Sequence, residues 1–181
     1  QLVSVDWNGL VGLWNTASAP HDRLERSRNT GGGQGVSLFA LAVHPQGRWV
    51  VSGDKKGGLH VWDLEGPATG AVDASVSDHN SRETVFGMTF SEDGQNLYTV
   101  GGENLNRWSV PATASSAAEF AREPKAVRLP GWGERLYSIA HAPGTLDRVA
   151  LGGSRSVMLA SPDRPSMLSY PIARTALQSQ S

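Results

Sequence analysis

The chain has 181 residues, of which 39% are hydrophobic and 18% are charged, and it contains 21 glycines and no cysteine. Its 16 basic and 17 acidic residues give a formal net charge of -1, so no overall field draws it to anionic lipid or nucleic acid, and direct nucleic-acid binding is not expected. The lack of cysteine excludes disulfides, cysteine-ligated zinc, iron–sulfur clusters and thiol catalysis.

The sequence shows no membrane or export signal. No apolar run approaches the roughly 18 residues of a membrane-spanning helix, so we expect no membrane insertion. The opening residues Gln1, Leu2 and Val3 have neither an initiator methionine nor a signal-peptide layout. Together with the missing cysteines, which fit a reducing compartment, this predicts an intracellular, cytoplasmic protein whose sequence is part of a longer chain.

The chain opens with two apolar runs of strand type, at 2–9 and 10–15. Trp7 lies in the turn between them, and Trp14 lies near the end of the second run. The next run, at 22–28, mixes charges of both signs. We expect it to be a solvated outer edge or, alternatively, a surface whose arginines meet an acidic partner.

Three later stretches are copies of one another, at 38–47, 85–94 and 136–144. In each copy an alternating apolar run, typical of a β-strand, leads into a turn of Pro, Asp or Gly. The turn glycines Gly47, Gly94 and Gly144 recur at intervals of 47 and 50 residues. Three copies at a similar spacing indicate a structural repeat.

Two further apolar runs follow each copy. The first of them ends in small residues and occupies 49–53, 97–102 and 149–153; the second occupies 58–63, 105–109 and 157–161. Trp14, Trp62 and Trp108 align 48 and 46 residues apart, and Ala160 takes the same place 52 residues later. A fourth strand of each unit is expected in the variable joints, near 71–77, 125–129 and 167–172.

The second unit resembles a WD40 blade most closely, through HPQG at 44–47, VSG at 51–53 and GLHVWD at 58–63. The resemblance extends over essentially the whole chain. It implies an all-β fold, a β-propeller of WD40 type with consecutive four-stranded antiparallel blades, here incomplete with about four blades. The implied division is blade 1 at 1–30 without its first strand, blade 2 at 36–78, blade 3 at 84–130, blade 4 at 134–173 and a tail at 174–181. The repeat motif is carried by Trp14, His44, Gly47, Ser52, Gly53, Trp62, Asp63, Gly94, Trp108 and Gly144.

A blade is a single sheet that must cover both of its faces with neighbouring blades, so apolar residues on either face become core. On this basis Phe39, Phe86 and Tyr137 are expected in the core. Positive φ is expected at the strand-end glycines Gly53, Gly101, Gly102, Gly152 and Gly153. At about 45 residues per blade, the chain makes about half of the seven-blade ring that the resemblance implies. The remaining blades would come from further sequence, a second chain or self-association.

WD40 blades often contain a hydrogen-bonded set of Asp, His, Ser or Thr, and Trp, and the resemblance implies where its members stand. Ser52 and Trp62 match the strand members, and His79 matches the histidine. The acidic member is missing from its usual place, where Lys56 stands, and Asp54 comes two residues early. We therefore expect no intact set in any blade.

Other residues that could carry chemistry fit structural roles better. His44 and His141 stand at equivalent places in different repeats, and this separation argues against a shared metal site. His60 alternates with apolar neighbours and is expected to pack within its strand. The glycines at 31–35 lack the rest of a phosphate-binding fingerprint and precede a strand, so we expect a joint there. Because neither GxSxG nor HExxH occurs, and no acidic or histidine cluster begins the first strands, we expect no catalytic, cofactor or metal residues.

Turns at one rim of the propeller carry the candidate partner-binding residues. Tryptophan and arginine are common anchors of interfaces, and Trp7 and Trp132 lie in turns where the repeat does not require them. The alternative is that each indole folds back over a neighbouring blade. The candidate rim residues are Trp7, Lys55, Lys56, His79, Arg82, Glu103, Asn104 and Trp132.

The leading functional hypothesis is a non-catalytic scaffold, a WD40 propeller segment within a larger protein or complex, that binds other proteins. The alternative is a sensor or regulatory repeat region of a larger signalling or NTPase protein. A propeller enzyme is disfavoured because no catalytic constellation is visible. The expected partners are other proteins or the remaining blades of the same propeller, and no cofactor is expected.

Overall fold

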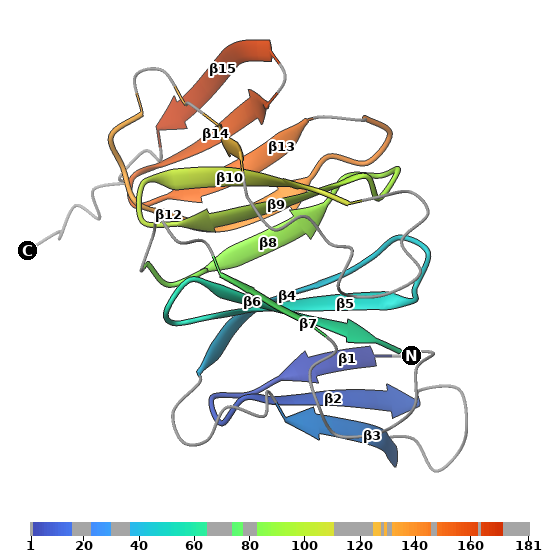
Figure 1. The fold of residues 1–181 in the computed structure, drawn as a ribbon. Coiled ribbons are helices and arrows are strands. Elements are labelled where there is room, and N and C mark those ends of the chain that lie inside the picture. The colour runs from blue at the N-terminus through green and yellow to red at the C-terminus, as the bar shows by residue number, and fades with distance from the viewer. Residues whose placement is uncertain are drawn as a thin grey trace, which may run out of the picture.

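The computed structural model describes residues 2–15, 23–29, 37–64, 74–77, 83–110, 125–127, 129, 132–145, 148–162 and 164–171. Every regular element in these ranges is a β-strand, which confirms the all-β prediction (Figure 1). Among these residues there is no helix long and apolar enough to cross a membrane.

The strands form four antiparallel sheets, in each of which neighbours in sequence are neighbours in space. The first sheet contains β1 (Leu2–Val5), β2 (Leu10–Asn15) and β3 (Arg23–Asn29). The second contains β4 (Leu38–Val43), β5 (Trp49–Asp54), β6 (Gly58–Asp63) and β7 (Ala74–Ser77). The third contains β8 (Gly87–Phe90), β9 (Asn96–Gly101), β10 (Asn104–Ser109) and β11 (Lys125–Val127). The fourth contains β12 (Leu136–His141), β13 (Val149–Gly153), β14 (Ser156–Ser161) and β15 (Arg164–Pro171).

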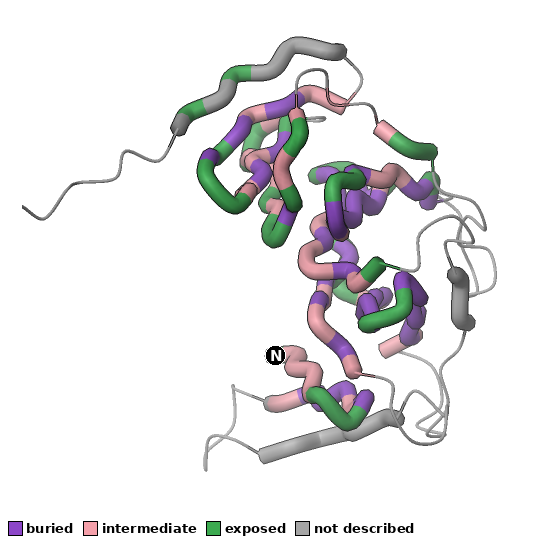
Figure 2. Tube along the Cα trace, turned by 90° about the vertical axis from the view of Figure 1, so that its left-hand side faces the viewer, coloured by how far each residue is buried: buried purple, intermediate pink, exposed green. Residues whose placement is uncertain are grey.

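The four sheets follow one another along an arc (Figure 2). Three apolar cores lie between consecutive sheets, and each core is filled from both of the sheets that enclose it. Representative members of the three cores are Val11 with Trp62, Val61 with Phe90, and Leu105 with Leu151. This stacking of sheets, each covered by the next, is consistent with a partial β-propeller.

The repeat glycines turn the chain from the first strand of a sheet to the second. Gly47, Gly94 and Gly144 have φ of 77°, 72° and 73°, in the left-handed region that favours glycine. The N–H groups of Gly47 and Gly94 donate to the carbonyls of His44 and Ser91, at 2.7 and 3.0 Å. The sequence repeat therefore reflects the recurrence of this turn in successive sheets.

The prediction of positive φ at the strand ends is wrong for Gly53, Gly101, Gly152 and Gly153, and holds only for Gly102, at 55°. All four glycines belong to strands, Gly101 and Gly153 as the last residues of β9 and β13. At Gly53 the reason for glycine is steric, because a Cβ there would stand 2.6 Å from Cγ1 of Val85, which lies just before β8. Glycine thus lets the third sheet approach the backbone of β5.

The expectation that Phe39, Phe86 and Tyr137 belong to the core is also wrong. Phe39 and Phe86 are half-buried, and Tyr137 is 45% exposed. The pairing of β4 with β5 shifts register at Phe39, and the pairing of β12 with β13 shifts at Tyr137. Such bulges re-aim a side chain away from the regular alternation of the strand, and here they take the rings out of the cores.

The expected fourth strands at 71–77, 125–129 and 167–172 coincide with or overlap β7, β11 and β15. In the described part of the chain the first sheet has three strands, and the charged run at 22–28 falls in β3, at the edge of that sheet. The division into blades at the boundaries given above stays a prediction. The glycine run at 31–35 lies outside the described residues.

Candidate functional site

The hairpin turn between β1 and β2 presents Trp7 to solvent. Asp6 fixes this turn, because one of its carboxylate oxygens accepts the backbone N–H groups of Asn8 and Leu10 at 2.8 and 2.9 Å. Trp7 lies next to Asp6 in the turn and is 72% exposed. A hydrogen-bonded turn thus holds out a large aromatic side chain, the residue type most enriched among binding hot spots.

Trp7 begins a row of aromatic rings that crosses all four sheets. Its ring centroid lies 5.3 Å from that of Phe39, which lies 6.1 Å from Phe86, which in turn lies 5.4 Å from Tyr137. The ring planes are tilted or edge-on, as aromatic pairs prefer. We call these four residues the aromatic row.

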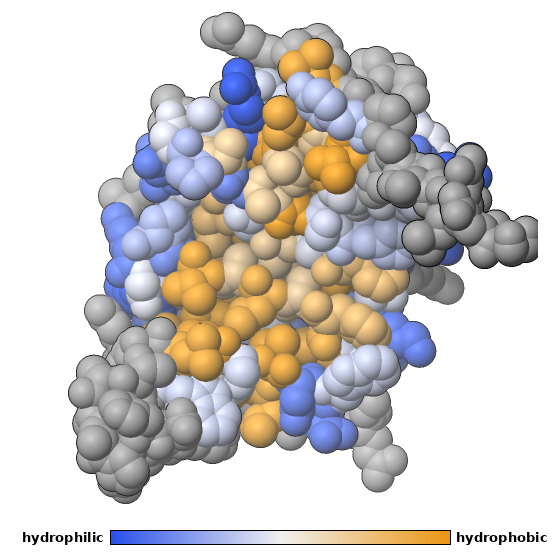
Figure 3. All heavy atoms as spheres, turned by 180° about the vertical axis from the view of Figure 1, so that it is seen from behind, coloured by the Kyte–Doolittle hydropathy of each residue, from blue (hydrophilic) through white to orange (hydrophobic). Residues whose placement is uncertain are grey.

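One face of the molecule is rich in apolar side chains (Figure 3). Seen from behind, the molecule shows apolar side chains gathered in a band that runs along the stack of sheets (Figure 3). Phe39 and Tyr137 sit at register shifts near the starts of β4 and β12, and Phe86 directly precedes β8. Equivalent positions at the starts of three first strands therefore supply the three later rings of the row.

Polar and charged residues of both signs lie in hairpin turns at the same end of the sheets as the aromatic row. Lys55 and Lys56 occupy the turn between β5 and β6, and Glu103 and Asn104 lie at the turn between β9 and β10. All four are exposed. The structure thus places Trp7, Lys55, Lys56 and Glu103 in equivalent hairpin turns, and Asn104 at the start of β10.

Trp132 differs from Trp7. It is half-buried and packs against the core between the third and fourth sheets, where a Cβ on Gly153 would stand 2.6 Å from its Cζ2. Its Nε1 is buried and has no hydrogen-bond partner among the described residues. The exposed-anchor interpretation therefore fits Trp7, whereas Trp132 fits the folded-back alternative. The other two rim candidates, His79 and Arg82, lie outside the described residues.

Asp54 organises the turn beside Lys55 and Lys56. One carboxylate oxygen accepts the N–H groups of Lys56 and Gly58 at 2.6 and 2.9 Å, and the other lies 2.9 Å from Nε2 of His60. Burial alone would raise the pKa of Asp54, but the hydrogen bonds from His60, Gly58 and Lys56 outweigh burial and hold this pKa below its usual range.

The second sheet contains two hydrogen-bonded pairs of the residue types in the set, but the expectation that no set is intact stays a prediction because His79 lies outside the described residues. Asp54, two residues early, supplies a carboxylate that binds buried His60. Trp62 donates its indole N–H to the hydroxyl of Ser52 at 3.1 Å. Sequence reasoning placed Ser52 and Trp62 in the set. It missed the pairing of Asp54 with His60, although a carboxylate and an imidazole can form a hydrogen bond.

The tryptophan–hydroxyl pair recurs in three sheets. Trp14 donates to Ser4 at 2.8 Å, and Trp108 donates to Thr99 at 3.0 Å. Sequence reasoning missed Ser4 and Thr99. The signal was present, because a hydroxyl residue stands nine or ten positions before each of the three repeated tryptophans.

The remaining motif residues have structural surroundings. Buried His44 packs edge-on against Phe90, with ring centroids 5.1 Å apart, and its Nε2 lies 3.2 Å from the carbonyl oxygen of Gly94. Asp63 forms an ion pair with Arg48 at 2.8 Å. Among the described residues no group of three or more His, Cys, Asp or Glu side chains is placed to hold a metal ion.

The chain is 27% identical over 104 residues to SEC12-like protein 2 from Arabidopsis thaliana, an alignment that covers 58% of this chain and 24% of that protein. The aligned part thus spans about a quarter of the length of the curated relative. No protein-family model matches the chain.

Proposed function

We propose that the chain is a segment of a WD40-type β-propeller that acts as a non-catalytic scaffold and binds partner proteins through the aromatic row. The observation that carries this proposal is the continuous contact of four aromatic side chains from four consecutive sheets. The repeated turns, the stacked four-stranded sheets and the similarity to SEC12-like protein 2 support the propeller.

The chemistry of the rim suits recognition of a protein surface. Trp7 and Tyr137, at the two ends of the aromatic row, are 72% and 45% exposed. Covering an exposed aromatic side chain stabilises a complex by about 2 kcal/mol. Lys55, Lys56 and Glu103, at the same end of the sheets as the row, are exposed charges, and rim charges of this kind set orientation and association rate more than affinity.

Site-specific photo-crosslinking tests the proposal. A benzoylphenylalanine in place of Trp7, in the organism that makes the protein, should crosslink to one or a few discrete proteins. Binding of the purified partner should then weaken about tenfold or more in Trp7→Ala and in Tyr137→Ala, since each change removes an anchor. The melting temperature of Trp7→Ala should stay close to that of the wild type, because the side chain is largely exposed.

A matched control position is Ser109, which is exposed on β10 and takes no part in the aromatic row. Benzoylphenylalanine in place of Ser109 should not capture the same proteins. The proposal is wrong if both positions give the same adducts, or if neither alanine variant weakens binding of the partner.

A further inference from the structure

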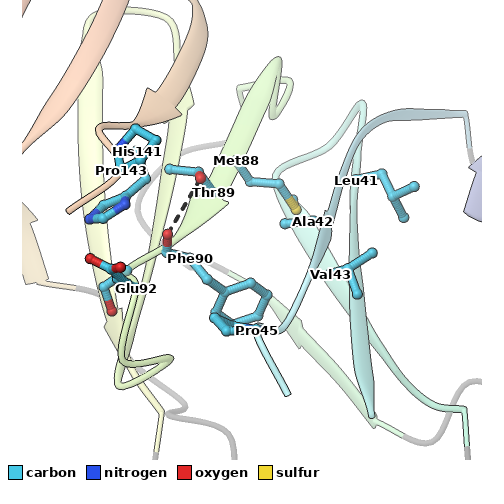
Figure 4. A pocket seen from close by; sticks show the side chains of 11 residues that line it. Leu41, Ala42, Val43, Pro45, Met88, Thr89, Phe90, Glu92, His141 and Pro143 are labelled. Carbon is cyan, nitrogen blue, oxygen red and sulfur yellow. Dashed lines mark hydrogen bonds between the residues drawn. The ribbon is translucent and has the colours of Figure 1, made fainter. Parts of the chain in front are cut away.

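A pocket of about 440 Å³ lies at the end of the first strands that is opposite the aromatic row. Its walls come from β4, β8 and β12 and from the turns that follow them (Figure 4). The lining includes Leu41, Val43, Met88, Phe90, Glu92 and His141. This volume falls within the range of about 300–1,000 Å³ that is usual for ligand sites.

One side of the pocket is apolar. Figure 4 shows Leu41 and Val43 of β4 on this side, and Met88 and Phe90 of β8 lie between them and the opposite side of the pocket. Val43 is 44% exposed although it is a large aliphatic residue at the end of a buried strand. An aliphatic chain that packs against this wall would bury apolar surface of the wall and of the chain itself, which favours binding.

The other side is polar and acidic. Figure 4 shows the Glu92 carboxylate and the His141 imidazole next to each other on this side. Glu92 is exposed, whereas Nε2 of His141 is buried and has no hydrogen-bond partner in the described part of the chain. A buried polar atom without a partner indicates a missing ligand or water, because leaving it unpaired costs free energy.

A second carboxylate, that of Asp93, adds negative charge near His141. The hydroxyl of Ser91 and the backbone N–H of Gln95 donate to Asp93 at 2.6 and 3.0 Å. These hydrogen bonds hold the pKa of Asp93 below its usual range. Asp93 is therefore ionised at neutral pH, and no lysine or arginine is among the lining residues that the structure describes.

We propose that this pocket binds a lysine or arginine side chain presented by a partner polypeptide. The aliphatic stem would lie against Val43 and Met88, and the charged end would donate hydrogen bonds to Glu92 and to His141. The acidic side disfavours anions, and the apolar wall disfavours small hydrated cations. This site lies at the opposite end of the first strands from the aromatic row. Failure of either proposal would therefore leave the other unaffected.

Titration of the 181-residue chain with short peptides tests this proposal. The peptides are acetyl-Gly-Ala-Arg-Ala-Gly-amide, its lysine analogue, and an analogue with neutral citrulline in place of arginine. We expect the arginine or the lysine peptide to bind with a dissociation constant below about 1 mM, and the citrulline peptide to bind about tenfold more weakly. The loss of charge is the only large difference between the arginine and citrulline peptides.

Two variants assign the binding to this pocket. Glu92→Gln should weaken binding of the basic peptide about fivefold or more, while Glu83→Gln, the same change at the opposite end of the third sheet, should leave it unchanged. His141→Phe should also weaken binding, and it should keep or raise the melting temperature of the free chain because it removes a buried unpaired atom. A purely structural role of His141 would instead lower the melting temperature.

Free agmatine distinguishes a polypeptide from a small metabolite as the source of the cation. Binding of the basic peptide that is tighter than binding of agmatine supports a partner polypeptide. If agmatine binds as tightly as the peptide, the proposal of a partner polypeptide is wrong and the site is assigned to a free organic cation. The proposal also fails if no basic peptide binds below millimolar concentration or if Glu92→Gln has no effect.

Discussion

Three tryptophans in equivalent places make the same interaction, an indole N–H that donates to a hydroxyl on the neighbouring strand. Trp62 is 1% exposed and Ser52 is fully buried, so their hydrogen bond is shielded from water. In the fourth sheet Ala160 takes the place of tryptophan, and Leu151 is aligned with the hydroxyl residue. The polar pair is thus either complete or replaced on both sides by apolar residues, because one buried partner without the other would remain unsatisfied.

A double-mutant cycle on Ser52 and Trp62 tests this interdependence. Ser52→Ala leaves the indole N–H unpaired, and Trp62→Phe leaves the hydroxyl unpaired and also removes volume from the core. We expect each single change to lower the free energy of unfolding by about 1–3 kcal/mol. The double variant should lose about 1 kcal/mol less than the sum of the two. Urea unfolding monitored by circular dichroism measures these values.

Tyr170→Phe is the matched control for this cycle, since Tyr170 is 53% exposed. Removing an exposed hydroxyl should change the free energy of unfolding by less than about 0.5 kcal/mol. Strict additivity of Ser52→Ala and Trp62→Phe would show that the indole and the hydroxyl do not interact in solution.

At the scale of the element, the turns after the first strands share their backbone but differ in their surroundings. Gly94 and Gly144 have almost the same positive φ, 72° and 73°. A Cβ on Gly94 would overlap the ring of His44 from the second sheet, whereas a Cβ on Gly144 would meet nothing within 4 Å. The turn after β8 therefore also packs against the neighbouring sheet. The turn after β12 makes no such contact at this position.

Gly94→Ala and Gly144→Ala separate the two requirements for glycine. Gly144→Ala should lower the free energy of unfolding by about 1–2 kcal/mol, the conformational cost of positive φ. Gly94→Ala should cost this amount and about 1–3 kcal/mol more, because His44 must shift in a packed interface. Chemical denaturation of both variants measures the difference. Equal losses would mean that His44 moves aside freely and that the contact between the two turns contributes nothing.

The strands could be predicted because their signals are local. Alternating apolar residues and a turn glycine at Gly47, Gly94 and Gly144 were enough to place β4, β8 and β12, and aligned tryptophans placed the third strands. The outer strands were expected in the variable joints between the repeated runs, and β7, β11 and β15 lie there. These features depend on residues close together in sequence, so they can be found without knowing how the sheets stack.

The candidate site could be predicted only in part, because it depends on contacts between sheets. Trp7 was found as an unusual turn residue, but its contact with Phe39 and the shift of register at Phe39 come from pairing between distant segments. Gly53 was expected to have positive φ, whereas the close approach of Val85, which lies just before β8, explains the glycine. His141 was weighed only as half of a metal pair, and its place in a pocket follows from the approach of three first strands.

At the scale of the molecule, each sheet covers one face of the sheet before it. Val11, Leu59 and Leu105 occupy aligned positions in the first, second and third sheets, and all three are at most 5% exposed because the next sheet packs on them. The aligned residue of the fourth sheet is Val157, which is 41% exposed. Val157 pairs with Tyr170 across β14 and β15, so both side chains lie on the same face.

The exposed face of the fourth sheet makes self-association the expected behaviour of the 181-residue chain in isolation. Leu168 is 61% exposed and Tyr170 53%, so apolar surface extends from Val157 across β15. Contiguous apolar surface of this kind promotes association. Sedimentation velocity at about 100 μM protein should show species larger than the monomer. Val157→Lys combined with Leu168→Lys should shift them to monomer, because association would bury the new charges, whereas Ser109→Lys on β10 should not. A monomeric wild-type chain at that concentration would show that the exposed apolar face of the fourth sheet does not drive self-association.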